Sequence, residues 1–347
     1  MRRSVDMAVP LSLMPERSDR KIMNLLITSA ARKVLLVEAF QDACAKTVGG
    51  EVWAGDLDWC AASLHAADRG VILPRADAGD FAPRLKAFCT QNDIKLIVPT
   101  RDGELPFLAA LRDEFKEAGI VIAVGSSETI EAVQDKRIFV KRCEESDLGV
   151  PKTYTDLSEF PDGPVFVKPR WGSAGEGARL VSDPEEAKRL FEEEGGKMVF
   201  QELVEAPEFT IDVFCDWDHK PISIVPRERI RVVSGESVVG RTIDHSGLVE
   251  EAAKLAQVFS LVGHNTLQAF VRGVDEILFI EVNPRYGGGA NLGFRAGAPT
   301  PLFLMQLLSG EAVPPRIGEY EKGLVMLRHS TDCFISAEDL EGEMDEI

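Results

Sequence analysis

The sequence lacks the features that mark secreted, membrane-spanning and nucleic-acid-binding proteins. Its six cysteines are scattered without paired spacing, which is typical of reduced thiols and argues against a disulfide framework or a zinc site. No apolar run approaches the length of a membrane span. Lys and Arg number 39 against 57 Asp and Glu, and the net charge of −18 argues against a nucleic-acid or anionic-membrane partner. We therefore predict a cytoplasmic protein that acts on small molecules.

Glycine is missing where a dinucleotide site would need it. Asn24–Thr28 has the pattern of a short buried strand, and the turn that follows it, Thr28–Lys33, contains no glycine. A dinucleotide-binding turn requires glycines so that the backbone can approach the pyrophosphate. A nicotinamide-dependent dehydrogenase is therefore disfavoured. Asp56 would be the ribose-binding acid in such a fold, and we interpret it as a turn or substrate-side residue instead.

The first third of the chain does contain a regular alternation of short apolar strands and helical stretches. We predict strands at 24–28, 51–56, 70–73 and 95–99, and helices at 33–45, 81–91 and 104–118. This order predicts a parallel sheet. The length of 347 residues allows two or three compact units. We predict an α/β domain followed by an α+β domain, in four segments: a disordered N-terminal extension (1–22), a Rossmann-like parallel-sheet domain (23–125), a second domain (126–335) and a solvated acidic tail (336–347).

The most informative segment is Phe279–Arg285, which carries oxygen ligands and an arginine in one strand and turn. Side chains alternate along an extended strand, so Glu281 and Asn283 share one face. Ile280 and Val282 are expected to point the other way, into a core. Taken alone, a buried strand with two solvated polar residues explains the segment better than a site does, and only the rest of the chain reverses that preference.

A second strand at 267–271 precedes this segment, and a tight turn over 273–276 joins the two. That turn places Gln268 opposite Glu281 on the same face of the sheet. One carboxylate and two amide oxygens suit a hard cation such as Mg²⁺, which shares its remaining positions with water and phosphates. Arg285 follows the strand-ending proline and is positioned to meet anionic charge.

A lysine-bearing strand leads into a glycine-rich turn. The predicted strand 163–169 carries Lys168 near its end, and the turn 170–178 contains Gly172, Ser173, Gly175 and Gly177. The lysine precedes the glycines, so the segment is not a Walker loop. It resembles a flap that closes over phosphates, with Lys168 supplying the charge from below. An ordinary hairpin turn explains the segment about equally well.

Two further segments are candidate ligand contacts. A linker between the strands 198–204 and 209–214 can read an adenine edge through its backbone, and Glu208 can accept from ribose hydroxyls, although a solvated loop is the better interpretation without further context. Arg227, Arg229 and Arg231 alternate along one strand and are expected to share a face. They bind a substrate carboxylate or phosphate, or they form a solvated edge paired with acids. Arg295 is a second substrate candidate.

The order of these parts resembles the ATP-grasp superfamily, and most of all the large subunit of carbamoyl-phosphate synthetase. The resemblance covers Met23 to about Phe334 and is most specific at the segment Ile280–Arg285. It implies a pre-ATP-grasp domain followed by a two-lobed ATP-grasp fold, with a small flap lobe at about 150–204. The chain holds one such unit where the synthetase subunit carries two, so complete carbamoyl phosphate synthesis is not expected of it.

The resemblance also implies the cofactors, ATP and Mg²⁺ with Mn²⁺ as an alternative metal, and the roles of the site residues. Lys136 and Lys168 would contact the ATP phosphates under the glycine turn, Glu202 and Val204 would meet adenine, Glu208 would hold ribose, Gln268, Glu281 and Asn283 would bind metal, and Arg285 with Lys168 would serve catalysis. The implied activity is an ATP-dependent carboxylate–amine ligase that forms an acyl phosphate. The alternative is an ATP-binding regulatory protein or a partial synthetase-like subunit. The implied partners are a small carboxylate, a small amine and a second copy in a homodimer.

Overall fold

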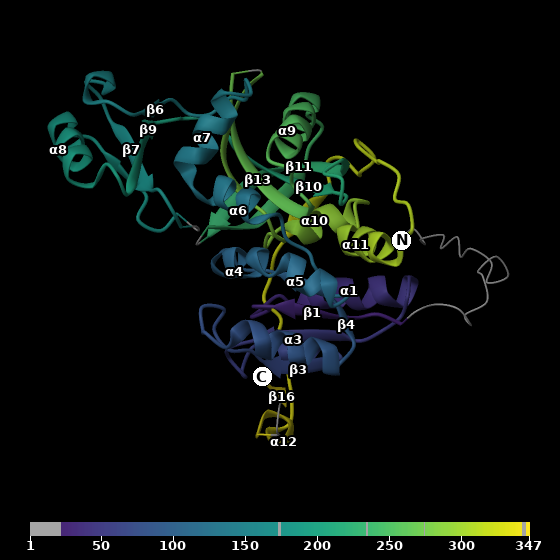
Figure 1. Ribbon diagram of the computed structural model, residues 1–347. Coiled ribbons are helices and arrows are strands. Elements are labelled where there is room, and N and C mark those ends of the chain that lie inside the picture. The colour runs from purple at the N-terminus through teal and green to yellow at the C-terminus, as the bar shows by residue number, and fades with distance from the viewer. Residues whose placement is uncertain (1–21, 173–174, 234, 274, 342–344) are drawn as a thin grey trace.

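The structure is a computed structural model that describes residues 22–172, 175–233, 235–273, 275–341 and 345–347. Three sheets organise the described chain: a parallel sheet of six strands, an antiparallel sheet of six strands and a smaller sheet of four strands (Figure 1). The predicted order of an α/β domain followed by an α+β domain is confirmed. The predicted N-terminal extension lies outside the described residues except for Ile22.

The N-terminal sheet is parallel throughout. Its strands are β1 (Asn24–Thr28), β2 (Val52–Asp56), β3 (Arg69–Ile72), β4 (Ile94–Pro99), β5 (Val121–Ile122) and β16 (Asp345–Glu346), in the order β16-β3-β2-β1-β4-β5. Its helices are α1 (Val34–Lys46), α2 (Ala62–Ala66), α3 (Phe81–Gln91), α4 (Leu105–Ala110) and α5 (Arg112–Glu117), with a short 3₁₀ helix, η3, at Asp102–Glu104. Leu25 and Ile27 pack in the core that α1 covers, and Leu26 packs in the core that α3 covers. Both faces are buried, which explains the continuous apolar run of β1.

Two elements of this domain differ from the sequence predictions. The helix expected over 104–118 is divided at Leu111, whose N–H bonds to the Leu108 carbonyl in a tighter turn. The expected solvated tail instead forms α12 (Ala337–Glu341) and then β16, which pairs with β3. The Ile347 amide donates to the Ile72 carbonyl at 3.1 Å, and its side chain packs against the core. The tail therefore supplies backbone partners to β3, which would otherwise be an edge strand.

The antiparallel sheet forms the body of the second domain. Its strands are β10 (Glu208–Cys215), β11 (Pro221–Val233), β12 (Glu236–Thr242), β13 (Gly263–Arg272), β14 (Glu276–Asn283) and β15 (Val325–Leu327), in the order β14-β13-β10-β11-β12-β15. One face packs against α6 (Ser127–Gln134), α7 (Lys136–Glu144) and α9 (Ser246–Val258). The other face packs against α10 (Ala290–Arg295) and α11 (Thr300–Ser309). The Ser126 hydroxyl caps α6 by accepting from the Thr129 amide.

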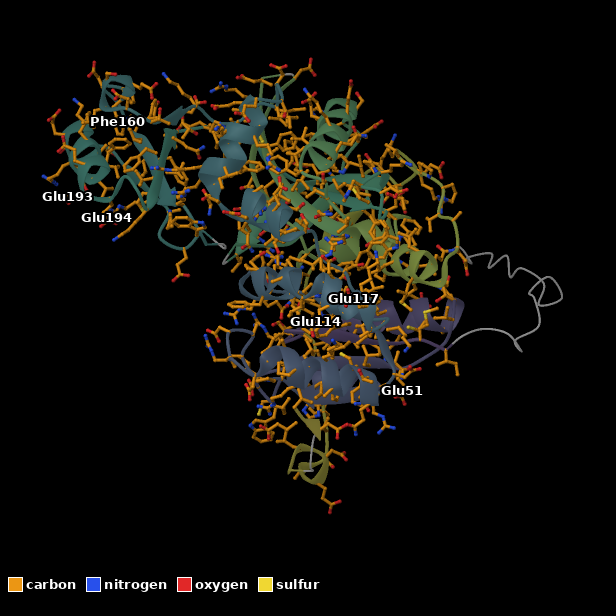
Figure 2. All side chains as sticks on the ribbon, viewed as in Figure 1. Glu51, Glu114, Glu117, Phe160, Glu193 and Glu194 are labelled. Carbon is orange, nitrogen blue, oxygen red and sulfur yellow. The ribbon has the colours of Figure 1, made fainter. Side chains whose placement is uncertain are left out.

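The small lobe projects from this body (Figure 1). It contains β6 (Thr153–Tyr154), η4 (Leu157–Glu159), β7 (Val165–Pro169), β8 (Arg179–Val181), α8 (Pro184–Glu194) and β9 (Met198–Glu202), with the sheet order β6-β9-β7-β8. Its core is separate from the others and centres on aromatic contacts among Phe160, Phe191 and Phe200. Figure 2 shows Phe160 in this lobe, with Glu193 and Glu194 at the end of α8.

The two domains share one hydrophobic core. Phe40 of α1, Phe214 of β10 and Phe303 of α11 belong to the same buried cluster, and α1 packs directly against α11. This junction holds the carboxyl ends of the parallel strands beside the antiparallel sheet. All six cysteines are free, as predicted, and no helix within the described part of the chain is long and apolar enough to cross a membrane.

Candidate active site

A cleft of about 560 Å³ lies between the small lobe and the antiparallel sheet. The predicted site residues that line it are Lys136, Lys168, Gly172, Gly175, Glu202, Val204, Glu208, Arg227, Arg229, Gln268, Glu281, Asn283 and Arg285. Of the other predicted residues that the structure describes, Gly177, Arg231 and Arg295 do not line it. Ser173 lies outside the described residues. Segments more than 100 residues apart in sequence therefore meet in one cavity.

The β13–β14 hairpin brings the predicted metal ligands together. Gln268 pairs with Glu281 across the hairpin, as the sequence predicts. The register shifts at the next position, where Ala269 pairs with Phe279, so Ile280 has no partner on β13. This bulge turns Ile280 into the cleft wall, and the prediction that Ile280 points into a core is wrong. Val282 is in the core as expected.

Hydrogen bonds orient the oxygen ligands along β14. The Asn283 side-chain amide donates to Glu281 Oε1 at 3.0 Å, and its oxygen accepts from an Arg285 Nη2 hydrogen at 3.1 Å. Gln268 lies opposite Glu281, so one carboxylate and two amide groups face the cleft together. No group of three or more His, Cys, Asp or Glu side chains is gathered for a metal within the described residues. This donor set fits Mg²⁺ that shares its coordination with phosphate oxygens.

Two buried lysines face this strand. Lys136 opens α7 directly after Asp135, whose carboxylate caps the helix by accepting from the Arg137 amide at 3.0 Å. The Lys136 ammonium donates to the Gly172 carbonyl of the glycine turn at 2.8 Å. Burial lowers the pKa of both lysines, that of Lys168 to about 8, and the negative charge of Glu281 opposes the shift in each. Two cations and a carboxylate are thus electrostatically coupled across the cleft.

The cleft also contains the two acids that were predicted to meet a nucleoside. Glu202 accepts from the Arg272 guanidinium at 3.0 Å and from the Lys152 amide at 2.9 Å. Glu208 pairs with Arg229 at 2.5 Å, and burial raises the pKa of Glu208 although Arg229 opposes the shift. Phe166 and Phe270 form an apolar part of the cleft wall. The sequence alone does not distinguish these two residues from ordinary core residues.

The prediction that all three alternating arginines share a face is wrong, because Arg227 and Arg229 both line the cleft and Arg231 does not. Arg227 is buried and pairs with the buried Asp212 at 2.7 Å, and Arg229 lines the cleft. The register of β11 against β12 shifts between Arg229 and Arg231, which leaves Arg231 on the exposed part of the strand. Arg295 is exposed at the end of α10. Arg227 is therefore occupied by a structural partner, and neither Arg231 nor Arg295 reaches the cavity.

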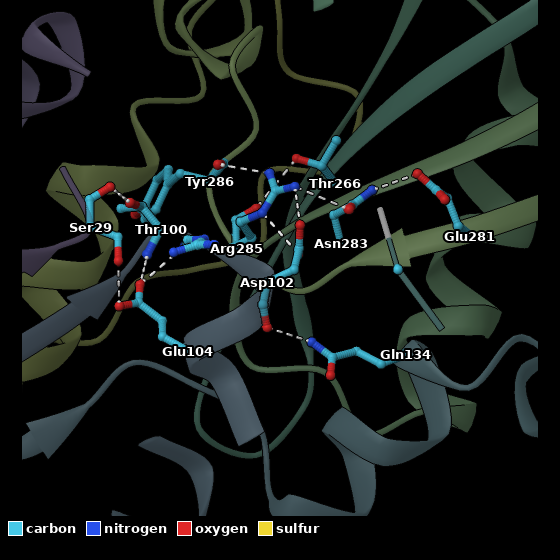
Figure 3. A network of polar contacts seen from close by, with 12 residues as sticks. Ser29, Thr100, Asp102, Glu104, Gln134, Thr266, Glu281, Asn283, Arg285 and Tyr286 are labelled. Atoms are coloured by element: carbon cyan, nitrogen blue, oxygen red, sulfur yellow. Dashed lines mark hydrogen bonds and ion pairs between the residues drawn. The ribbon is translucent and has the colours of Figure 1, made fainter. Parts of the chain in front are cut away.

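Sequence reasoning missed Asp102. Its carboxylate accepts from Arg285 Nε at 2.9 Å and from Arg285 Nη2 at 2.6 Å, which joins the N-terminal domain to the turn that follows β14 (Figure 3). A signal was available, because Asp102 follows the carboxyl end of β4, and ligands of open α/β sheets bind at that edge.

The two-lobed architecture and the glycine turn over paired lysines define an ATP-grasp site. Residues 133–289 match the ATP-grasp domain family and residues 25–123 match the family described as PylC-like, N-terminal domain. The chain therefore carries an ATP-grasp domain behind a PylC-like N-terminal domain, and the prediction of an ATP-grasp protein is confirmed. The narrower likeness to carbamoyl-phosphate synthetase stays a prediction.

Solved structures with the same fold are distant in sequence. The biotin carboxylase domain of a 2-oxoglutarate carboxylase from Hydrogenobacter thermophilus has 15% identity and a TM-score of 0.70, covering 88% of this chain and 74% of that one. An N5-carboxyaminoimidazole synthetase from Staphylococcus aureus has 15% identity and a TM-score of 0.69, with 89% and 83% covered. An L-amino acid ligase from Bacillus licheniformis has 18% identity and a TM-score of 0.65, with 86% and 78% covered. No curated protein matches the chain by sequence.

Proposed function

We propose that this protein is an ATP-dependent ligase that activates a carboxylate as an acyl phosphate and joins it to an amine, releasing ADP and phosphate. The observation that carries this proposal is the convergence of two buried lysines with three oxygen ligands, Lys136, Lys168, Gln268, Glu281 and Asn283, in one cleft. Cations for phosphate oxygens and hard ligands for a divalent ion are the parts that phosphoryl transfer requires.

The reaction consists of two displacements. In the first, a carboxylate oxygen attacks the γ-phosphorus of ATP while the bond to the β-phosphate oxygen breaks, which gives an acyl phosphate and ADP. In the second, the amine nitrogen attacks the acyl carbon, the bond to the phosphate oxygen breaks, and the nitrogen loses a proton. Neither step needs an oxidant or a reductant, so positioning and charge neutralisation are the main contributions that the chain must make.

The residues of the cleft divide these tasks. Lys136 on α7 and Lys168 on β7 neutralise phosphate oxygens. Both ammonium groups interact electrostatically with Glu281 of β14, so they lie beside the candidate metal ligands. Arg285, two residues beyond Asn283, meets the transferred phosphate. Glu208 holds the ribose end. A Mg²⁺ ion held by Gln268, Glu281 and Asn283 would supply further positive charge to the phosphate oxygens.

Related structures support a nucleotide in this cleft. The structure of the Hydrogenobacter domain is described as a complex with MgADP and bicarbonate, and that of the Staphylococcus synthetase as a complex with ADP. The Bacillus protein is an L-amino acid ligase. These proteins share the fold with this chain, and their ligands support ATP and Mg²⁺ as its cofactors and a ligase as its class.

The proposal is tested by ADP and phosphate release from the purified protein with MgATP and pooled carboxylic acids and amines. We expect release that requires one acid and one amine together. Glu281→Gln removes a metal-binding charge at constant size, so we expect release to fall by about 10²-fold or more. Glu114→Gln, an exposed acid of α5, is the control and should behave as wild type.

Either of two outcomes contradicts the ligase proposal. Near-normal release by Glu281→Gln would show that β14 holds no catalytic metal. MgATP binding without release by any pool would favour the alternative, an ATP-binding regulatory protein or partial subunit.

A further inference from the structure

The N-terminal domain places one carboxylate beside the turn that follows β14 of the ATP-grasp domain. Asp102 is the first residue of η3 and binds Arg285, 183 residues further along the chain, through both carboxylate oxygens. The side chains of Asp102 and Arg285 are 20% and 19% exposed. The pair is therefore largely shielded from solvent, where a charge-assisted pair with two parallel hydrogen bonds is strong and directional.

The backbone around Asp102 is fixed by its own domain. The Glu104 carboxylate accepts from the amides of Thr100 and Arg101 at 2.8 and 3.1 Å, and from the Ser29 hydroxyl at 2.8 Å (Figure 3). The Thr100 hydroxyl donates to the carbonyl oxygen of Ser29 at 2.8 Å. These bonds join the loop after β4 to the turn after β1, so the position of Asp102 is set by two neighbouring strands of the parallel sheet.

The backbone of Asp102 also contacts the segment that carries a phosphate lysine. The Gln134 side chain donates to the Asp102 carbonyl at 2.8 Å. Gln134 ends α6, and Lys136 begins α7 two residues later. Asp102 thus touches the lysine segment through its backbone and Arg285 through its side chain. Asp102 therefore connects the segment that carries Lys136 to the segment that carries Arg285.

Hydrogen bonds occupy four of the five N–H donors of Arg285. Nε and one Nη2 hydrogen bind Asp102, and the second Nη2 hydrogen binds Asn283. One Nη1 hydrogen binds the Tyr286 carbonyl at 3.3 Å. The remaining Nη1 hydrogen has no partner among the described residues and is available to an anion. Asp102 makes the two shortest of these bonds, so it sets the plane of the guanidinium and the direction of the free donor.

We propose that Asp102 is the positioning residue for Arg285: it holds the guanidinium so that Nη1 meets the transferred phosphate, and it makes the N-terminal domain part of the catalytic apparatus. The role of Arg285 in this statement rests on the proposed ligase function. The pair itself does not. An arginine without this partner retains its charge but loses the fixed orientation that phosphoryl transfer uses.

A double-mutant cycle tests the proposal with Asp102→Asn, Arg285→Ala and the double variant, beside Glu114→Gln. Glu114 of α5 pairs with Lys86 at 2.8 Å in the same domain (Figure 2), and it is not among the residues that line the cleft. Phosphate release should fall about 10-fold or more in Asp102→Asn, with kcat affected and KM for MgATP within about 2-fold. The double variant should equal Arg285→Ala alone. Unchanged release in Asp102→Asn, or a double loss equal to the product of the single losses, would overturn the proposal.

A second measurement decides the proposal without any substrate. The ¹⁵N–¹H signals of arginine Nε groups report the Asp102–Arg285 pair directly, and the signal that Arg285→Ala removes should shift and exchange faster in Asp102→Asn. An Arg285 signal that is unchanged in Asp102→Asn would show that the carboxylate does not orient the guanidinium. A failed ligase proposal would appear differently, as absent phosphate release in the wild-type protein with an intact Nε signal.

Discussion

A buried lysine is costly to fold, and the cleft contains one, Lys168, that we propose contacts phosphate. Burial lowers the pKa of Lys168 to about 8, and nearby Lys136 adds to the shift while Glu281 opposes it. At neutral pH the protein therefore holds a cation in a place that disfavours charge. A ligand that compensates the charge would explain such a group, and this supports the proposed role of Lys168 in phosphate binding.

Replacing this lysine should stabilise the free protein and remove the pH dependence of stability that it causes. The folded-state pKa of Lys168 lies below the unfolded value of about 10.4, so the folded state binds fewer protons and wild-type stability rises with pH between about 8 and 10.4. Lys168→Met lacks this cost, and we expect its Tm at pH 7 to be higher by a few degrees. Thermal unfolding at pH 7 and pH 9.5 measures both effects. A lower Tm for Lys168→Met at pH 7 would contradict this account.

Nucleotide affinity should fall as pH rises through the pKa of Lys168. The free protein loses the Lys168 proton above about pH 8, and with it a positive charge that faces phosphate. We expect MgADP, measured by calorimetry, to bind more weakly at pH 9 than at pH 7. Lys168→Arg cannot lose its proton in this range, so its affinity should stay nearly constant. An equal decline in both proteins would assign the pH dependence to another group.

At the scale of elements, β10 and β11 are joined by a buried ion pair behind the cleft. Burial alone would raise the pKa of Asp212, but the charge and hydrogen bond of Arg227 at 2.7 Å, with His264 Nε2 at 3.7 Å, hold it lower, at about 2. Gly289 passes so close to the Arg227 guanidinium that a Cβ there would collide with it. The segment that follows β14 therefore packs against this ion pair at Gly289, which gives Arg227 a structural role.

Replacing one partner of this ion pair should lower the free energy of unfolding more than replacing both partners. Arg227→Met leaves the Asp212 charge buried without its partner, so we expect the free energy of unfolding to fall by about 3–5 kcal/mol. The double variant Asp212→Leu with Arg227→Met removes both charges and should lose less. Urea denaturation at pH 7 compares the three proteins. A double variant less stable than Arg227→Met would show that the pair contributes through packing or hydrogen bonds rather than charge.

The same strands show what the sequence can and cannot predict. The sequence correctly predicts that Gln268 lies opposite Glu281, because this pairing depends only on strand alternation and one tight turn, which are local properties. The sequence does not predict the bulge at Ile280 or the register shift before Arg231, because a bulge depends on the partner strand. Asp102 was missed for a related reason. Its partner is 183 residues away, and no local pattern encodes that contact.

At the scale of the molecule, the domains identified by sequence are not independent folding units. The core that contains Phe40 of the N-terminal domain also contains Phe214 and Phe303 of the ATP-grasp domain. The small lobe differs, because Phe200 lies in a core formed only by residues of that lobe. The contact that orients Arg285 crosses the shared junction, so the junction must be rigid for the site to work. The lobe that carries the glycine turn has its own core and is joined to the body by the Lys136–Gly172 and Arg272–Glu202 contacts.

Two matched core substitutions test this division. Phe303→Ala and Phe200→Ala each remove a buried ring, at a cost of about 3–5 kcal/mol each. Phe303→Ala should accelerate amide hydrogen exchange in β1 and β10 together, because both strands pack in or beside the shared core. Phe200→Ala should accelerate exchange in β7 and β9 while β1 stays protected. Exchange in Phe303→Ala that increases in β10 but not in β1 would mean that the two domains unfold separately, and a catalytic pair spanning Asp102 and Arg285 would then lack the rigid support that it requires.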